Sequence, residues 1–313
     1  MIPVTDGAAR SGHPRAMETN PRLVGVILAA LMLGGCNGDG DAWGSLSLGV
    51  TDAPVDSASR VIVEFTGVEL VHQDGTVETF AFDAPRRIDL LSLQGGAAEL
   101  LLDAVAVPAG HYESVRLSVN AARTGSSSFI EYEDGSVHPL FVPSGSEAGL
   151  RLVSGFDVPA GGAADFTIDF DLRRAVVRPP GLAPDHILRP ALRLVDNTEI
   201  GSIAGRVAES LVFPADASDC TPAVYVFSGA NVEPTDVAGE AGPLLTAAVA
   251  LEEPTGEYRY RAAFLAVGDY TVAFTCDAED DLADSEDGIG FVGGTKSVTV
   301  VAGGESVVNF PAD

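Results

Sequence analysis

The sequence predicts an all-β protein made of two β-sandwich domains, and three observations support this prediction. Short runs such as Ser45-Leu46-Ser47-Leu48-Gly49-Val50 alternate polar and apolar residues with period two, as half-buried strands do. Turn signals such as Asp74-Gly75 separate these runs at regular spacing. No amphipathic run is long enough for a substantial helix, so we expect sandwiches of the immunoglobulin-like or transthyretin-like kind.

The first 35 residues predict a secretion signal. Arg22 precedes an uncharged apolar run of 11 residues, Leu23 to Leu33, which is followed by two glycines and Cys36. A membrane-spanning helix needs about 20 apolar residues, so an uncleaved anchor is disfavoured. A signal for soluble secretion would end on an Ala-x-Ala-like site, whereas Leu33-Gly34-Gly35-Cys36 resembles the bacterial lipoprotein box. We therefore expect a signal peptide over residues 1–35, an acylated, palmitate-bearing Cys36 and a linker over residues 36–42.

The expected lipid also predicts a location. Several acyl chains on one processed cysteine make dissociation from the bilayer negligible, so the membrane is an expected partner. Asn37 follows Cys36, and the absence of aspartate at this place resembles the pattern of lipoproteins sorted to the outer membrane. We expect a lipid-anchored protein of the bacterial outer membrane, facing the periplasm or the cell surface, whose translation begins at Met1 or Met17.

The net charge of the chain limits the classes of partner that we expect. Removing residues 1–35 takes three arginines and two carboxylates from a formal net charge of −27, which leaves −28. Such an acidic surface repels nucleic-acid phosphates and anionic head groups, so nucleic acid is not an expected partner. Cations, basic partners and simple solubility in a salty environment stay open as interpretations.

The first β-sandwich domain is expected over residues 43–197. Arg60 to Phe65 continues the pattern of Ser45 to Val50, and Asp74-Gly75 joins two strands as a hairpin. Ile88 to Gln94 could form one helical turn, and Ala97 to Val105 fits a buried strand, although periodicity decides neither. Further strands are expected at Val77 to Phe82, Tyr112 to Asn120, Phe129 to Glu133, Val137 to Val142, Ala163 to Phe170 and Ile187 to Val195.

A second β-sandwich domain is expected over residues 200–313, after the polar segment Asp196-Asn197-Thr198-Glu199. Gly268-Asp269-Tyr270-Thr271-Val272-Ala273-Phe274 resembles a strand of prealbumin-like modules, as found in carboxypeptidase regulatory-like domains. The expected strands are Ile200 to Val207, Ala223 to Ser228, Leu244 to Leu251, Glu257 to Ala263, Gly268 to Thr275, Lys296 to Val301 and Ser306 to Phe310.

One segment resembles a known family over about residues 43 to 195. Gly44 to Pro54, with the sequence Thr-Asp-Ala-Pro at its end, is similar to the opening of the bacterial lipoproteins grouped as domain of unknown function 4382. Four later segments follow in the family's order: Ile88 to Leu93, Pro108-Ala109-Gly110-His111-Tyr112, Phe170-Asp171-Leu172-Arg173-Arg174 and Leu188 to Leu194. The resemblance implies a bacterial lipoprotein and brings no established activity.

The two remaining cysteines predict a disulfide. Cys220 and Cys276 would lie in a compartment where disulfides form and persist, and neither has a histidine beside it in the sequence. Their bridge would close a loop of 57 residues. A structural role is therefore favoured over a redox or metal-binding role.

An acidic segment near the C-terminus is the sharpest candidate for a cofactor site. Residues 277–287 carry seven carboxylates, and calcium takes six to eight oxygen ligands. The spacing does not match the EF-hand pattern, so a solvated acidic loop is the alternative interpretation. The calcium candidates are Asp277, Glu279, Asp280, Asp281, Asp284, Glu286 and Asp287.

Two other carboxylate motifs favour structural roles. Asp52, before Ala53-Pro54, can bond nearby backbone amides and fix a turn, with a ligand or metal contact as the alternative. Asp169 and Asp171 share one side of a strand, where carboxylate pairs can do acid/base work. Arg173 and Arg174 are close enough to neutralise them, which favours a salt-bridged strand end.

These observations favour a non-catalytic binding or structural module over an enzyme. The sequence has no G-x-S-x-G elbow, H-E-x-x-H pair, Walker loop or Rossmann glycine set. A carbohydrate-binding protein and a calcium-stabilised adhesion module are the alternatives, with a glycan or an envelope protein as partner. Tyr258 and Tyr260 share one face of a strand, and a third ring beside them would favour glycan binding. The other candidate rings are Trp43, Tyr112, Tyr132, Tyr225 and Tyr270.

Overall fold

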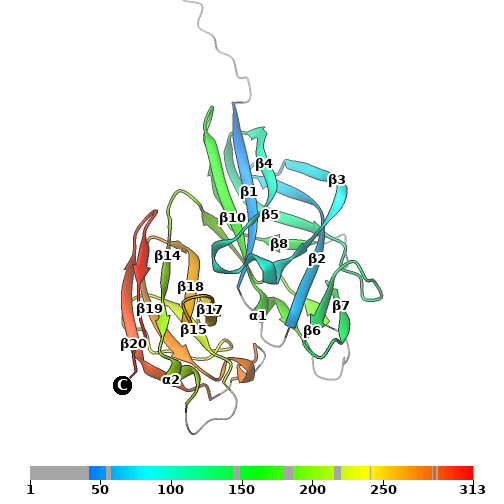
Figure 1. The fold of residues 1–313 in the computed structure, drawn as a ribbon. Helices are drawn as coiled ribbons and strands as arrows, with labels where there is room; N and C mark the ends of the chain where they lie inside the picture. The colour runs from blue at the N-terminus through cyan, green and yellow to red at the C-terminus, as the bar shows by residue number, and fades with distance from the viewer. Residues whose placement is uncertain are drawn as a thin grey trace, which may run out of the picture. The chain divides into compact units, whose positions relative to one another are not determined.

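The computed structural model describes residues 42–53, 58–143, 149–178, 186–214, 220–239, 241–283, 285–286 and 288–312. Residues 41–313 form one compact unit. Its strands assemble into four sheets (Figure 1). The predicted signal peptide, Cys36 and most of the linker lie outside the described residues. Among the helices that the structure does describe, none is long and apolar enough to cross a membrane.

Two sheets form the first sandwich. The smaller has the strand order β13-β10-β1-β4, in which β1 lies parallel to β10 although more than one hundred residues separate them in sequence (Figure 1). The larger has nine strands around the long β2, which pairs with β3, β5 and β6. The strands of the smaller sheet are β1 (Trp43–Ala53), β4 (Glu99–Pro108), β10 (Ala163–Asp171) and β13 (Leu192–Asp196). Those of the larger are β2 (Ala58–His72), β3 (Val77–Asp89), β5 (Gly110–Val119), β6 (Phe129–Tyr132), β7 (Val137–Phe141), β8 (Leu150–Leu152), β9 (Phe156–Val158), β11 (Val176–Val177) and β12 (His186–Leu188).

The inward faces of these two sheets form one apolar core. Leu46, Leu48 and Val50 alternate along β1 and are buried, which is the period-two pattern of the sequence. Phe65 of β2 meets Phe170 of β10 across the core, with ring centroids 6.2 Å apart. The core therefore joins the two sheets into a sandwich.

The second sandwich follows β13. Its sheets have the orders β17-β18-β14-β21 and β16-β15-β19-β20. The strands are β14 (Ile200–Val207), β15 (Ala223–Ser228), β16 (Leu245–Ala248), β17 (Ala250–Glu252), β18 (Glu257–Ala266), β19 (Gly268–Thr275), β20 (Phe291–Val300) and β21 (Glu305–Val307). Short helices occur in both halves: η1 (Leu90–Gly96), α1 (Leu172–Ala175), α2 (Glu209–Val212) and η2 (Ala278–Asp280).

Strand β15 is buried on both of its faces. Val224 and Val226 belong to the core between the two sheets of the second sandwich. Tyr225 and Phe227 point to the other side, where Val237 and Ala278 cover them in a second apolar cluster. The segments around residues 237 and 278 therefore form an extra layer over the outer face of the β16-β15-β19-β20 sheet.

The all-β prediction is confirmed, and two predicted strands are each divided in two. Ile187 to Val195 breaks around Pro190, which lacks a backbone N–H for a sheet ladder, and gives β12 in one sheet and β13 in the other. Leu244 to Leu251 likewise crosses between sheets at Val249, as β16 and β17. The segment Ile88 to Gln94 includes the start of η1, so the helical-turn interpretation is correct there.

Candidate functional site

The most elaborate polar cluster lies where α1 of the first sandwich meets the outer layer of the second. Helix α1 begins directly after β10, and the Asp171 side chain caps it by accepting a hydrogen bond from the Arg174 backbone N–H at 3.2 Å. Arg173 and Arg174 therefore leave the first sandwich at a fixed point. We call this cluster the junction; its members are Asp171, Arg173, Arg174, Tyr225, Val237, Ala278 and Asp281.

Arg173 is a buried cation that crosses the junction. Only 6% of its surface is exposed. Its Nη1 donates to the Ala278 carbonyl at 2.9 Å and to the Tyr225 hydroxyl at 3.0 Å, and its guanidinium carbon lies 5.6 Å from the Tyr225 ring centroid. The Tyr225 hydroxyl in turn donates to Asp281 Oδ2 at 2.6 Å. The charge of Arg173 is thus balanced by an anion of the second sandwich, through tyrosine.

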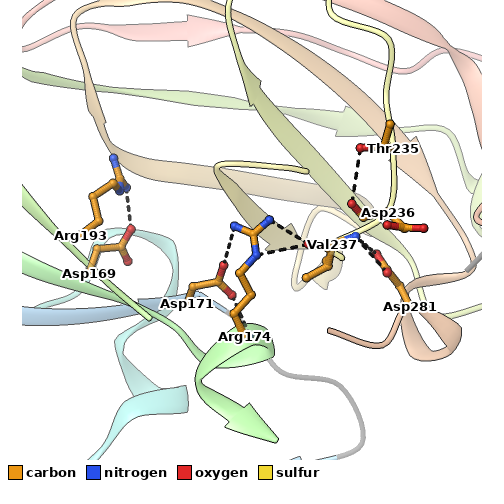
Figure 2. Close-up of polar contacts among 8 residues, drawn as sticks. All are labelled: Asp169, Asp171, Arg174, Arg193, Thr235, Asp236, Val237 and Asp281. Atoms are coloured by element: carbon orange, nitrogen blue, oxygen red, sulfur yellow. Dashed lines mark hydrogen bonds and ion pairs between the residues drawn. The ribbon is translucent and has the colours of Figure 1, made fainter. Parts of the chain in front are cut away.

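Arg174 is the second arginine of the first sandwich that bonds the second sandwich. Its Nη2 donates to the Val237 carbonyl at 2.9 Å, and its Nη1 lies 3.3 Å from Asp171 Oδ2 (Figure 2). The backbone N–H of Val237 donates to Asp281 at 3.0 Å. One peptide segment of the second sandwich is therefore held by Arg174 on one side and by Asp281 on the other.

The predicted salt-bridged strand end exists, but its pairing differs from the prediction. Arg174 neutralises Asp171, as expected, whereas Asp169 is paired with Arg193 at 2.5 Å, across the β10–β13 ladder (Figure 2). Arg173 points into the second sandwich instead. The reason is topological, because β13 pairs with β10 and places Arg193 opposite Asp169.

Burial governs the acid–base properties of the junction. It raises the pKa of Asp281, against the hydrogen bonds from Tyr225 and Val237, which favour the charged form. Burial likewise raises the pKa of Asp171 and of Asp169, against the opposing charges of Arg174 and Arg193.

The structure gives the acidic segment several separate roles. Asp281 is buried and accepts from Tyr225 and Val237, Asp277 Oδ2 accepts from the Gly290 N–H at 2.8 Å, and Glu279 accepts from the Thr221 hydroxyl at 3.2 Å. Asp284 and Asp287 lie outside the described residues. Within the described ranges, no three Asp, Glu, His or Cys side chains gather as a metal site would require. Calcium binding stays a prediction.

A cleft of about 440 Å³ is lined by residues of both sandwiches. The first sandwich lines it with Thr51, Asp52, Asp169 and the end of η1, and the second with residues of β16, β17 and β18. Thr51 fixes this wall, because its hydroxyl lies 2.7 Å from the Ala97 carbonyl and 3.0 Å from that of Leu93. Asp52 of the Thr-Asp-Ala-Pro motif is buried, and its turn-fixing role stays a prediction; Pro54 lies outside the described residues.

Cys220 and Cys276 form the predicted disulfide. It ties the entry to β15 to the end of β19, next to the segment that carries Ala278 and Asp281. The disulfide therefore braces the part of the second sandwich that receives Arg173.

The aromatic residues considered as candidates for glycan binding differ in burial and in the contacts of their polar groups. Five tyrosines have hydroxyls bonded inside the protein: Tyr112 to Pro108, Tyr132 to His186, Tyr225 to Asp281, Tyr260 to Val308 and Tyr270 to Ala266. Tyr258 and Tyr260 do not cluster together on an open surface, the arrangement that would favour glycan binding, because Tyr260 is buried in the core of the second sandwich. Tyr258 is only partly buried and packs edge-on against Phe213. Trp43 is exposed at the start of β1.

Comparisons with known proteins find a family model that matches one segment of the chain. Residues 43–190 match the family described as Domain of unknown function (DUF4382). This range contains the segments on which the resemblance in the sequence rests, apart from the last few residues of Leu188 to Leu194. No curated protein matches the chain.

Solved structures give distant similarities. A leucine-rich repeat protein from Bacteroides thetaiotaomicron is 15% identical with a TM-score of 0.22, and covers 87% of this chain and 26% of its own. The TIE protein of Bacillus anthracis is 9% identical with a TM-score of 0.19, over 87% of this chain and 34% of its own. This chain thus spans about a quarter and about a third of the lengths of these two proteins. GBS52, the minor pilin of Streptococcus agalactiae, is 10% identical with a TM-score of 0.19, and the match covers 86% of this chain and 98% of the pilin.

Proposed function

We propose that the segment matched by the DUF4382 family model, residues 43–190, which we call the DUF4382 domain, is a structural module that holds a second β-sandwich in a fixed position. The whole chain is then a non-catalytic, lipid-anchored envelope protein that presents the second sandwich for binding. The observation that carries this proposal is the buried Arg173, which leaves the DUF4382 domain and donates hydrogen bonds to Tyr225 and Ala278 of the second sandwich.

The chemistry of the junction supports a permanent rather than a transient arrangement. Burying a guanidinium is costly unless hydrogen bonds and a counter-charge replace its water. Arg173 has both, because Ala278 and Tyr225 accept from it and Asp281 lies one hydrogen bond further. Separating the two sandwiches would remove these partners together, so the separated state is disfavoured.

A non-catalytic role agrees with the state of the buried carboxylates. A general acid or base must exchange its proton with a substrate. Asp169 is held by Arg193, Asp171 by Arg174, and Asp281 by Tyr225 and Val237. These groups therefore serve the architecture.

Distance measurements between the sandwiches test the proposal. Spin labels at Thr79→Cys of β3 and Val301→Cys after β20, in a chain with Cys36→Ser, should give one narrow distance distribution. Arg173→Ala combined with Arg174→Ala should broaden it, whereas Arg189→Ala, which removes an exposed arginine, should leave it unchanged. A broad distribution in the otherwise unaltered chain would contradict the structural role.

The lipid anchor has its own test. The apolar run before Cys36 and the Cys220–Cys276 disulfide both suit an exported protein. We expect mass spectrometry of protein recovered from the outer-membrane fraction to find an acylated N-terminal Cys36, and Cys36→Ser to move the chain out of this fraction. Recovery of the unaltered chain from the cytosol, with a free Cys36, would reject the anchor.

A further inference from the structure

Tyr258 stands apart from the other tyrosines of this chain. The five others use their hydroxyls inside the protein, and within the part of the chain that the structure describes no residue bonds the hydroxyl of Tyr258. A tyrosine that is partly buried by its ring and has an unused hydroxyl is typical of a surface that meets a polar ligand.

A groove of about 400 Å³ lies beside this tyrosine. It is bordered by the end of β14, the start of β18 and the C-terminal segment, with Arg206, Glu257, Tyr258 and Asn309 among its walls. This volume falls in the range of sites that hold small molecules, about 300 to 1,000 Å³. The groove is therefore large enough for one or two sugar rings.

An exposed ring packs against Tyr258, one of the residues that line the groove. Phe213 has 62% of its surface exposed, and its ring centroid is 5.6 Å from that of Tyr258, with an interplanar angle of 75°. An exposed phenylalanine packed against a second aromatic ring offers rigid apolar area at little entropic cost. The C–H face of a pyranose ring is a shape that such a surface accepts.

Planar polar groups stand next to these rings. Arg206 is paired with Glu257, and its backbone N–H donates to Asn309 Oδ1 at 2.9 Å, which fixes the asparagine beside the pair. Guanidinium, carboxylate, carboxamide and phenol groups together supply donors and acceptors in fixed directions. Adjacent hydroxyls of a sugar, each both donor and acceptor, match this set.

The charges favour a neutral ligand. The positive charge of Arg206 is already balanced by Glu257, and Glu209 also borders the groove. An anionic ligand would meet these carboxylates in a chain with a formal net charge of −27. We propose that the groove lined by Tyr258, Arg206, Glu257 and Asn309, together with the Phe213 ring that packs against Tyr258, binds a neutral saccharide. This inference rests on the proposed function, because it assigns a ligand class to the sandwich that the DUF4382 domain presents.

Titration calorimetry with three named probes tests this inference. Maltotriose, cellotriose and triacetylchitotriose are each titrated into the chain with Cys36→Ser, up to 10 mM. We expect saturable binding of at least one probe, and at least tenfold weaker binding to Tyr258→Ala and to Phe213→Ala. Tyr258→Phe, which removes a single hydroxyl, should weaken binding about threefold to tenfold, the range expected for one hydrogen bond.

The controls are two other aromatic positions. Trp43→Ala removes an exposed ring of the first sandwich, and Tyr260→Phe removes the buried hydroxyl of the neighbouring tyrosine; both should bind as the parent does. Absence of binding for all three probes, or unchanged binding to Tyr258→Ala, would overturn the saccharide site. Absence of binding with a narrow spin-label distance would reject this site alone, whereas binding with a broad distance would reject only the structural role of the DUF4382 domain.

Discussion

At the scale of single residues, we expect the substitution of Arg173 to lower the free energy of unfolding most. Arg173→Ala removes the cation that balances Asp281 and leaves the Ala278 carbonyl without its donor. We expect a loss of about 3 kcal/mol in the free energy of unfolding, as is typical when one partner of a buried ionic network is removed. Urea unfolding followed by tyrosine fluorescence measures it, with Arg189→Ala as the exposed control. Equal effects of the two substitutions would show that the junction adds no stability.

Asp281 predicts a pH dependence. Burial raises the pKa of the Asp281 carboxyl above its ordinary value of 3.8, so the folded state binds the proton more tightly than the unfolded state. This group therefore supports folding below pH 3.8, and its contribution is lost as the pH rises through the raised pKa. Asp281→Asn keeps an oxygen for Tyr225 but has no proton to lose.

Comparing the parent protein with Asp281→Asn tests this pH dependence. The difference in unfolding free energy, parent minus Asp281→Asn, should fall as the pH rises from 3.8 and become constant above the raised pKa. Urea titrations at a series of pH values measure it. A difference that grows with pH would mean that the pKa of Asp281 is lowered in the folded protein.

Contacts between residues that are close in sequence could be predicted, whereas contacts between residues that are far apart in sequence could not. Asp171 and Arg174 are three residues apart, so their ion pair could be inferred from spacing. Arg173 meets Tyr225 and Ala278, which follow 52 and 105 residues later, and no local pattern encodes such pairs. Asp281 was grouped with calcium candidates because composition cannot distinguish an inward-facing carboxylate from an outward-facing one.

At the scale of elements, periodicity located most strands but not their partners. Val77 to Phe82 and Ala223 to Ser228 were predicted as strands and are found as β3 and β15. The parallel pairing of β1 with β10 was not predicted, because pairing depends on packing over long separations. Three-residue strands such as β8 and β9 are too short to show a period.

The contact between β1 and η1 predicts an effect of Thr51. Thr51→Val keeps the shape of the side chain but removes the hydroxyl that bonds the Leu93 and Ala97 carbonyls. We expect a loss of about 1 to 2 kcal/mol, because two carbonyls lose a buried donor. Hydrogen exchange should show faster exchange in residues 93–97. Thr79→Val, at an exposed position of β3, is the matched control, and equal exchange in both variants would contradict this role for the threonine.

At the scale of the whole molecule, composition and length indicated the class but not the assembly. A strand-rich chain of 313 residues with turns at regular spacing predicts sandwiches. The contact between the two sandwiches depends on a few residues, here two arginines and an aspartate. So few residues do not change the overall composition, so composition could not predict the contact. The polar segment Asp196 to Glu199 does lie between β13 and β14, as its turn chemistry predicts.

Differential scanning calorimetry tests the junction most directly, because it reports whether the two sandwiches unfold together. The account predicts a single transition for the Cys36→Ser chain, with equal calorimetric and van't Hoff enthalpies. Arg173→Ala with Arg174→Ala should separate it into two transitions, one for each core. Two separate transitions in the parent chain, or one unchanged transition in the double variant, would contradict the claim that these arginines hold the sandwiches together.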